Sequence, residues 1–469
     1  EEMAGLRAPR CADAMVEEME KAVDSHMGSC QIELFKIIRR HTGKASAAGG
    51  KLACVYKTTA DGEHVLDERG EKVIVRGNGV LAEVENQERR INSTREIDTT
   101  ALTDLLEWVG KPEITEGKPL KELIGWTEFE RALRKQKLGK GVGCDGFDAY
   151  LLRRADIEVQ RLYHTVLSEA VLGETLPEEW NTWIALLAMK PGEHPADLGR
   201  RRDLWLQCHG SKLLMRMLLA DYNRAAEGWV PASQAGFTTH RNAPEQSLVA
   251  RLAVEQAMLE RTCVLRGYID YSCYFMSIVH AVQWEVERSV GVRPEVTAVV
   301  RTLREGLAEL DMPPLKGRFE TAHGLTDLVD IMQGLGQGCL LSPSRANMTL
   351  AIAQRAVSRL CGGFTFRADG RDVPQLYYAD DGALLAGGGN VGEATATLQL
   401  AFECTWLVSQ ILGLKMSIKG KRKTAWCGTY WSGGLELDIS GWEIRLPNGD
   451  LVPQLRADEM NKYLGTELA

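Results

Sequence analysis

The sequence lacks the usual signatures of disulfide-linked, zinc-bound and membrane-spanning proteins. Its 469 residues include 11 cysteines and nine histidines, yet no Cys-x-x-Cys pair occurs and no histidines stand at metal-ligand spacing. Neither a disulfide framework nor a zinc site is indicated, and a reducing, intracellular location in the cytoplasm, the nucleus or both is expected. No apolar run approaches the roughly 18 to 20 residues of a membrane span, and no signal peptide is visible, so no membrane partner is expected.

An excess of positive charge is also missing. Lys and Arg total 56 against 64 Asp and Glu, which gives a formal net charge of −8 and argues mildly against a nucleic-acid partner. Basic residues nevertheless gather in residues 131–140, 200–202 and 415–423. These runs are either solvated helix faces or local patches that bind phosphates.

Hydrophobic periodicity and turn residues predict helices alternating with short strands, an α+β arrangement. The expected extended segments are 182–190, 263–272 and a pair within 314–332. The expected helices are 126–138, 211–226, 244–261, 295–309, 393–411 and one that starts at about 275.

One hairpin carries an unusual pair of charges. The segment LYYADDGALLAGGG, residues 376–389, places Asp380 and Asp381 between apolar runs, with a tight turn expected at Asp-Asp-Gly. Two such charges repel by about 4 kcal/mol at 4 Å with an effective dielectric near 20. The segment is either a plain turn or a cation site, since Mg²⁺ binds one or two carboxylates and completes its shell with water and phosphate.

A third carboxylate stands in a similar position. Asp270 ends an apolar extended segment, and Phe275 follows five residues later. Phe275 fits either core packing or a wall against the sugar of a bound nucleotide. Carboxylates at two strand ends, if they meet, can hold two metal ions that activate a 3′-hydroxyl and stabilise leaving pyrophosphate.

Seven segments together resemble the reverse transcriptase domain of non-LTR (LINE-type) retrotransposons. YYADDG is similar to the Tyr-x-Asp-Asp motif, YIDYSCYFMSIVH to the preceding Asp-containing motif, and GLGQGCLLSPSRANMTL to the Gln-Gly-x-x-x-Ser-Pro motif between them. GKGVGCDGF, LPEEWNTWIALLAMKPGEHPADLGRRRDLWL, QAGFTTHRNAPEQ and KYLGT resemble the upstream Gly-Asp-Gly loop, the fingers segment, the Gln-Ala-Gly-Phe segment and the primer grip. The matches follow the family's order over about residues 110–465.

The resemblance implies a catalytic and metal-binding triad of Asp270, Asp380 and Asp381, which would hold two Mg²⁺ ions, with Mn²⁺ as a substitute. It places the backbone around Tyr271 near metal and triphosphate, and it makes Phe275 the gate against a ribose 2′-hydroxyl. The remaining implied roles are triphosphate binding by Lys190 and Arg202, packing against the nascent base pair by Gln337 and Gly338, proton donation by Lys421 or Lys423, and a primer grip at Tyr463, Leu464 and Gly465.

The same resemblance implies a right-hand polymerase with fingers and palm, an antiparallel palm sheet backed by helices, and a thumb that is largely missing. The implied segments are a helical or irregular spacer (1–110), fingers (111–262), palm with the first catalytic Asp (263–299), a fingers/palm connection (300–345), palm with the hairpin and following helix (346–435), and the primer-grip region at the start of the thumb (436–469).

The expected function is an RNA-directed DNA polymerase, and the expected partners are an RNA template, a DNA primer and dNTPs. A second interpretation is a catalytically inactive, reverse-transcriptase-like RNA-binding module from a decayed element, which Met276 and Asp203 favour because they replace residues usual in the family. A telomerase-type or intron-encoded enzyme of the same palm is a third interpretation.

Overall fold

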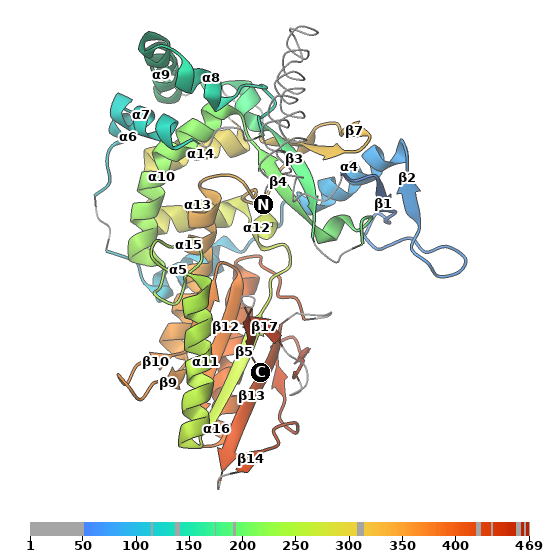
Figure 1. The fold of residues 1–469 in the computed structure, drawn as a ribbon, viewed down its shortest axis with the longest axis vertical. Coiled ribbons are helices and arrows are strands. Elements are labelled where there is room, and N and C mark those ends of the chain that lie inside the picture. Colours follow the sequence, from blue (N-terminus) through green and yellow to red (C-terminus); the bar gives the residue numbers. More distant parts are fainter. Residues whose placement is uncertain are drawn as a thin grey trace, which may run out of the picture.

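The chain combines helices with two five-stranded sheets, which confirms the predicted α+β class (Figure 1). The computed structural model describes residues 51–113, 116–136, 141–173, 175–190, 194–306, 314–418, 424–432, 435–455, 461–463 and 466–468. Over this part of the chain, none of the helices combines the length and apolar character needed to cross a bilayer.

A central antiparallel sheet occupies one half of the molecule, with strand order β11-β12-β5-β13-β14. Its strands are β11 (Gln375–Tyr378), β12 (Asp381–Gly388), β5 (Cys263–Ile269), β13 (Ala425–Ser432) and β14 (Leu435–Leu437). Every residue of β5 is buried, as expected for the middle strand of a sheet covered on both faces. The predicted segment 263–272 therefore forms a strand that ends directly before Asp270.

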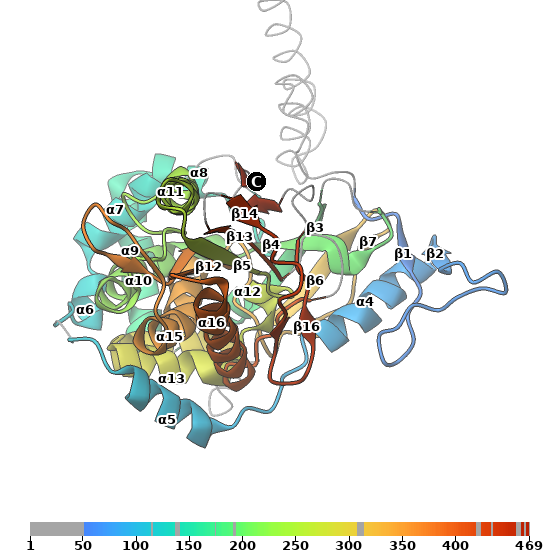
Figure 2. The ribbon, with the colours of Figure 1, turned by 90° about the horizontal axis from the view of Figure 1, so that it is seen from below.

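Helices cover both faces of this sheet. Figure 2 shows α11 (Ala243–Glu260) on one face and α16 (Val391–Ile411), with α15 (Ser342–Leu360) beyond it, on the other. Gly267 makes the close approach of α16 possible, because a Cβ at this position would lie 2.6 Å from the Phe402 ring. Asparagine begins both long helices: the Asn242 and Asn390 side chains accept from the backbone N–H three residues later, a favoured N-cap arrangement.

The second sheet belongs to the other half of the molecule, with strand order β4-β3-β6-β7 and β8 also paired with β6. Its strands are β3 (Thr182–Met189), β4 (Arg201–Leu206), β6 (Lys316–Thr321), β7 (Gly324–Leu325) and β8 (Val329–Asp330). β3 and β4 are antiparallel, whereas β3 and β6 are parallel. The connected ends of β3 and β4 reach the cavity described below, through Lys190 directly after β3 and residues 201–204 of β4.

Helices surround the second sheet and connect it to the first (Figure 1). They are α4 (Gly79–Ile91), α5 (Thr99–Val109), α6 (Leu120–Leu123), α7 (Trp126–Lys135), α8 (Ala149–Arg154), α9 (Ile157–Leu172), α10 (His209–Trp229), α12 (Tyr274–Ser277), α13 (His280–Val290) and α14 (Pro294–Glu305). Short strands and single turns complete the described chain: β1 (Cys54–Tyr56), β2 (Ile74–Arg76), β9 (Phe364–Thr365), β10 (Asp372–Val373), β15 (Ile444–Arg445), β16 (Leu451–Val452), β17 (Asn461–Tyr463), β18 (Thr466–Leu468), η1 (Glu178–Asn181) and η2 (Leu198–Arg200).

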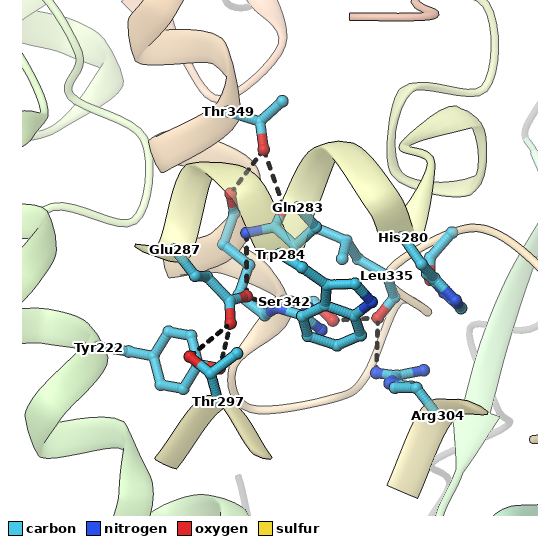
Figure 3. A network of polar contacts seen from close by, with 12 residues as sticks. Tyr222, His280, Gln283, Trp284, Glu287, Thr297, Arg304, Leu335, Ser342 and Thr349 are labelled. Atoms are coloured by element: carbon cyan, nitrogen blue, oxygen red, sulfur yellow. Dashed lines mark hydrogen bonds and ion pairs between the residues drawn. The ribbon is translucent and has the colours of Figure 1, made fainter. Parts of the chain in front are cut away.

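A buried polar network ties α10, α13, α14 and α15 together (Figure 3). The guanidinium of Arg345 and the carboxylate of Glu287, both fully buried, form an ion pair of 2.6 Å. Tyr222 donates to the same carboxylate over 2.9 Å, and Gln283 donates to it over 3.1 Å. Thr297 of α14 donates to the Glu287 carboxylate over 3.3 Å, and the buried Arg304 of the same helix donates separately to the Leu335 carbonyl, in the loop that enters α15, at 3.4 Å.

Candidate active site

The hairpin with the paired carboxylates turns earlier than predicted. Tyr378 pairs with Asp381 and Tyr377 with Gly382, so Ala379 and Asp380 are the two turn residues, not Asp-Asp-Gly. Ala379 adopts φ 56°, the left-handed conformation that such turns require. Gly382 is instead a strand residue, and a Cβ there would lie 2.4 Å from the Tyr377 ring. Glycine at position 382 is therefore explained by close packing against Tyr377 and not by a turn.

Gln234 holds this turn in place. Its fully buried side chain accepts from the Ala379 N–H over 2.8 Å and donates to the Ala379 carbonyl over 3.0 Å. The backbone continues the contact, because Tyr377 donates to the Ser233 carbonyl and Ala235 donates to the Tyr377 carbonyl, each at 2.8 Å. The QAGF segment was recognised in the sequence, but its role in positioning the carboxylate turn was missed.

Asp270 lies beside the hairpin because β5 and β12 are neighbouring antiparallel strands. Ile269 pairs with Gly382, so the residue after β5 and the residue before Gly382 lie together at the same end of the sheet. The Asp270 backbone is fixed by an N–H donated to the Thr424 hydroxyl at 3.1 Å and a carbonyl that accepts from Ser417 N–H at 2.8 Å. The predicted meeting of the strand-end carboxylates is thus a consequence of strand register.

The carboxylates and two cations interact electrostatically. Burial raises the pKa of Asp380, repulsion by Asp270 raises it further, and Lys190 and Arg202 oppose the shift. Asp381 is an exposed residue, yet nearby protein atoms dehydrate its carboxylate enough to raise its pKa to about 6, with Asp380 and Asp270 adding to the shift. Negative charge is therefore concentrated here beyond what the two cations neutralise.

A cavity of about 700 Å³ joins the carboxylates to the second sheet. Its lining includes Asp270, Asp380, Lys190 and Arg202, whereas Asp381 is not part of it. Lys190 directly follows β3, and Arg202 pairs with Ala188 across β3 and β4, so both cations come from the same end of that strand pair. The structure thus brings acidic and basic groups, 68 or more residues apart in the chain, to one cavity.

Asp203, next to Arg202, does not simply cancel that positive charge. Burial raises its pKa to about 6, with Lys190 opposing the shift. The pKa of the buried Glu88 is also raised, first by burial and then by repulsion from Asp203. Both shifts oppose ionisation of this acidic pair, which leaves the cations less compensated.

The Gly-rich loop before α15 lines the same cavity with Gln337 and Gly338. The Gln337 carbonyl accepts from Trp205 N–H over 2.8 Å, which ties the loop to β4. Gly338 adopts φ 114°, and a Cβ there would lie 2.8 Å from the Trp205 carbonyl oxygen, so only glycine fits without a shift. Leu335 donates to the Phe275 carbonyl over 2.8 Å and so connects the loop to α12.

Phe275 lines the cavity with a half-buried side chain that also packs against the hydrophobic core. Tyr271 is buried, and its hydroxyl hydrogen-bonds with Ser409 at 3.2 Å. Burial raises the Tyr271 pKa to about 12, so this phenol stays protonated at neutral pH. Met276 is buried and lines the same cavity.

Some predicted site residues cannot be placed. Lys421, Lys423, Leu464 and Gly465 lie outside the described residues. Tyr463 is the last residue of β17, which pairs with β18. The primer-grip and proton-donor roles therefore remain sequence predictions.

The residues present fit a divalent cation that also contacts phosphate. Within the described ranges, no three His, Cys, Asp or Glu side chains are close enough to form a complete metal site. Mg²⁺ needs only one or two protein carboxylates, however, because water and substrate phosphates supply its other ligands. Asp270 and Asp380 provide such carboxylates in a cavity that also contains two cations suited to phosphate.

The raised carboxylate pKa values predict a pH effect on stability without divalent cations. Asp380 and Asp381 bind protons more tightly in the folded than in the unfolded chain, so their contribution falls as pH rises from about 4 to about 6. Urea unfolding in EDTA should show Asp380→Asn/Asp381→Asn gaining stability relative to the parent across this window. A constant difference between the two proteins from pH 4 to pH 7 would contradict the expected proton linkage.

Comparison with known proteins adds no assignment. No protein-family model matches the chain, and a search of curated proteins finds no match. Functional inference therefore depends on the geometry of the cavity and the chemistry of its residues.

Proposed function

We propose that the chain is an RNA-directed DNA polymerase that extends a DNA 3′-end on an RNA template. The supporting observation is the single cavity in which Asp270 and Asp380, at the end of the central sheet, face the same space as Lys190 and Arg202. Nucleotidyl transfer needs carboxylates for divalent cations on one side of the reacting phosphate and positive charge on its non-bridging oxygens. The cavity contains both kinds of group.

In this proposal the central sheet is the palm and the second sheet belongs to the fingers. Two Mg²⁺ ions, when bound by Asp270, Asp380 and Asp381, would supply activation of the 3′-hydroxyl and neutralisation of the leaving pyrophosphate. Lys190 and Arg202 would bind the triphosphate and orient it, since charge-assisted hydrogen bonds to phosphate are short and strong. Phe275 and Gln337, which line the same cavity, would contact the sugar and the nascent base pair.

Arg202→Ala should raise the KM for dTTP by about tenfold or more, because a hydrogen bond to a charged group contributes about 1.5–3 kcal/mol. The kcat should change less, since part of this binding is already made before the chemical step. Steady-state primer extension over a range of dTTP concentrations measures both constants. Arg367→Ala removes an exposed arginine from the β9–β10 turn and is the matched control; an equal rise in KM for both variants would remove Arg202 from the nucleotide site.

Primer extension on poly(rA) with an oligo(dT) primer, labelled dTTP and Mg²⁺ tests the proposal. We expect synthesis that requires Mg²⁺ or Mn²⁺, and weakening of primer–template binding as salt rises, because phosphate contacts release counterions. Template binding without any synthesis would instead favour the inactive RNA-binding module. Absence of both binding and synthesis would contradict the polymerase and the binding module alike.

A further inference from the structure

Phe237 is an aromatic residue in an unusual backbone conformation at the edge of the cavity. Its φ is 56°, in the left-handed region that bulky side chains rarely adopt. Its side chain is 56% exposed although it is large and apolar. Such backbone strain persists where surrounding contacts fix it, and it is concentrated at functional sites.

The contacts that fix Phe237 come from residues on both sides of it. Gly236 donates its N–H to the Gln234 amide oxygen over 2.9 Å, and its carbonyl accepts from the buried Asn347 amide over 2.7 Å. The Thr238 hydroxyl donates to the same carbonyl at 3.2 Å, and Arg241 donates to the Gln234 carbonyl at 2.9 Å. The backbone at 237 is therefore held by a network that also holds the carboxylate turn.

The ring of Phe237 meets the ring of Phe275. Their centroids are 6.2 Å apart with planes at 86°, an edge-to-face arrangement, and both residues line the cavity with Asp270 and Asp380. Core packing does not explain Phe237, because more than half of its surface faces solvent. The two rings form an aromatic corner in the lining of the cavity that also contains the carboxylates and the cations.

We propose that Phe237 is a specificity-determining residue that packs against the sugar and base of the incoming nucleoside triphosphate and braces Phe275. This inference rests on the proposed function and deepens it by adding a second aromatic to the nucleotide site. The corner offers apolar contact and no hydrogen-bond partner for a 2′-hydroxyl, so it favours the deoxyribose form. Lys190 and Arg202 remain the residues proposed to bind the triphosphate.

Nucleotide binding to a stalled complex tests Phe237 without requiring catalysis. The full chain is mixed with an RNA template and a DNA primer ending in a dideoxynucleotide, and the Kd values of dTTP and UTP are measured with Mg²⁺ present. Phe237→Ala should weaken dTTP binding about tenfold, a magnitude typical of lost aromatic stacking, and should reduce the preference for dTTP over UTP. Phe237→Tyr keeps the ring and should bind dTTP like the parent.

Two further variants separate the outcomes. Trp442→Ala removes another exposed aromatic, which does not line the cavity, and should leave both Kd values unchanged. Phe237→Leu preserves apolar volume and replaces Phe237→Ala if circular dichroism shows the latter to be unfolded. Folded Phe237 variants with parental Kd values would overturn the inference. A parent that binds neither nucleotide would also overturn it. If the parent binds nucleotide but never extends a normal primer, the proposed activity alone is overturned.

Discussion

Gly236→Ala should lower the kcat of primer extension by about 10²-fold while the protein stays folded. A Cβ at this position would lie 2.0 Å from the Ala379 backbone nitrogen and 2.8 Å from the Tyr378 carbonyl carbon, so backbone has to move. The atoms that move belong to the turn that presents Asp380. A displacement of about 1 Å at reacting groups can cost about 10²-fold in rate.

Gly362→Ala is the matched control for this substitution. Gly362 lies between α15 and β9, its φ is not in the left-handed region, and an added Cβ there would meet nothing within 4 Å. We expect parental kcat and KM for this variant. Both alanine variants are measured by single-nucleotide incorporation and circular dichroism. A Gly236→Ala enzyme with parental kcat would show that catalysis does not depend on the present position of the turn.

Glu287→Gln should lower the free energy of unfolding by about 3–5 kcal/mol, the usual cost of breaking a buried ion pair from one side. The substitution keeps the shape of the side chain but leaves the fully buried Arg345 without its carboxylate. Arg304 is buried nearby, and burial already lowers its pKa to about 10, so the network contains more positive than negative charge. Urea unfolding followed by circular dichroism measures the loss.

Glu285→Gln, two residues earlier on α13, is the control because Glu285 pairs with Arg288 at the exposed surface. An exposed pair contributes at most about 1 kcal/mol, so this variant should unfold close to the parent. Equal destabilisation by the two substitutions would contradict the role given to the buried pair.

Local sequence patterns predicted individual elements well where burial follows a simple period. The alternating segment 182–190 forms β3, and the apolar segment starting at 263 forms β5. The expected helix from about 275 is two helices, α12 and α13, since the chain becomes extended at Ile278. The ends of helices and strands depend on capping residues and tertiary contacts, and hydrophobic periodicity carries no information about these.

In the candidate site, too, local sequence features were predictable and contacts between distant residues were not. Asp380 and Asp381 are noticeable in the sequence because adjacent charges between apolar runs are costly. The sequence places their turn too late, because Asp-Gly is a strong turn signal. In the structure Gly382 lies in a strand, where the Tyr377 ring leaves no room for a Cβ. Gln234 could not be connected to Ala379 from sequence, since the two are 145 residues apart and their hydrogen bonds exist only in the folded chain.

The measurement that tests the central claim most directly is dTTP incorporation on poly(rA) by the parent and by Asp380→Asn/Asp381→Asn, compared at equal concentration over a salt series. The proposed function predicts Mg²⁺-dependent synthesis by the parent and a rate lower by at least about 10³-fold in the variant, with template binding retained. Synthesis by the variant at the parental rate would contradict the assignment of catalysis to these carboxylates.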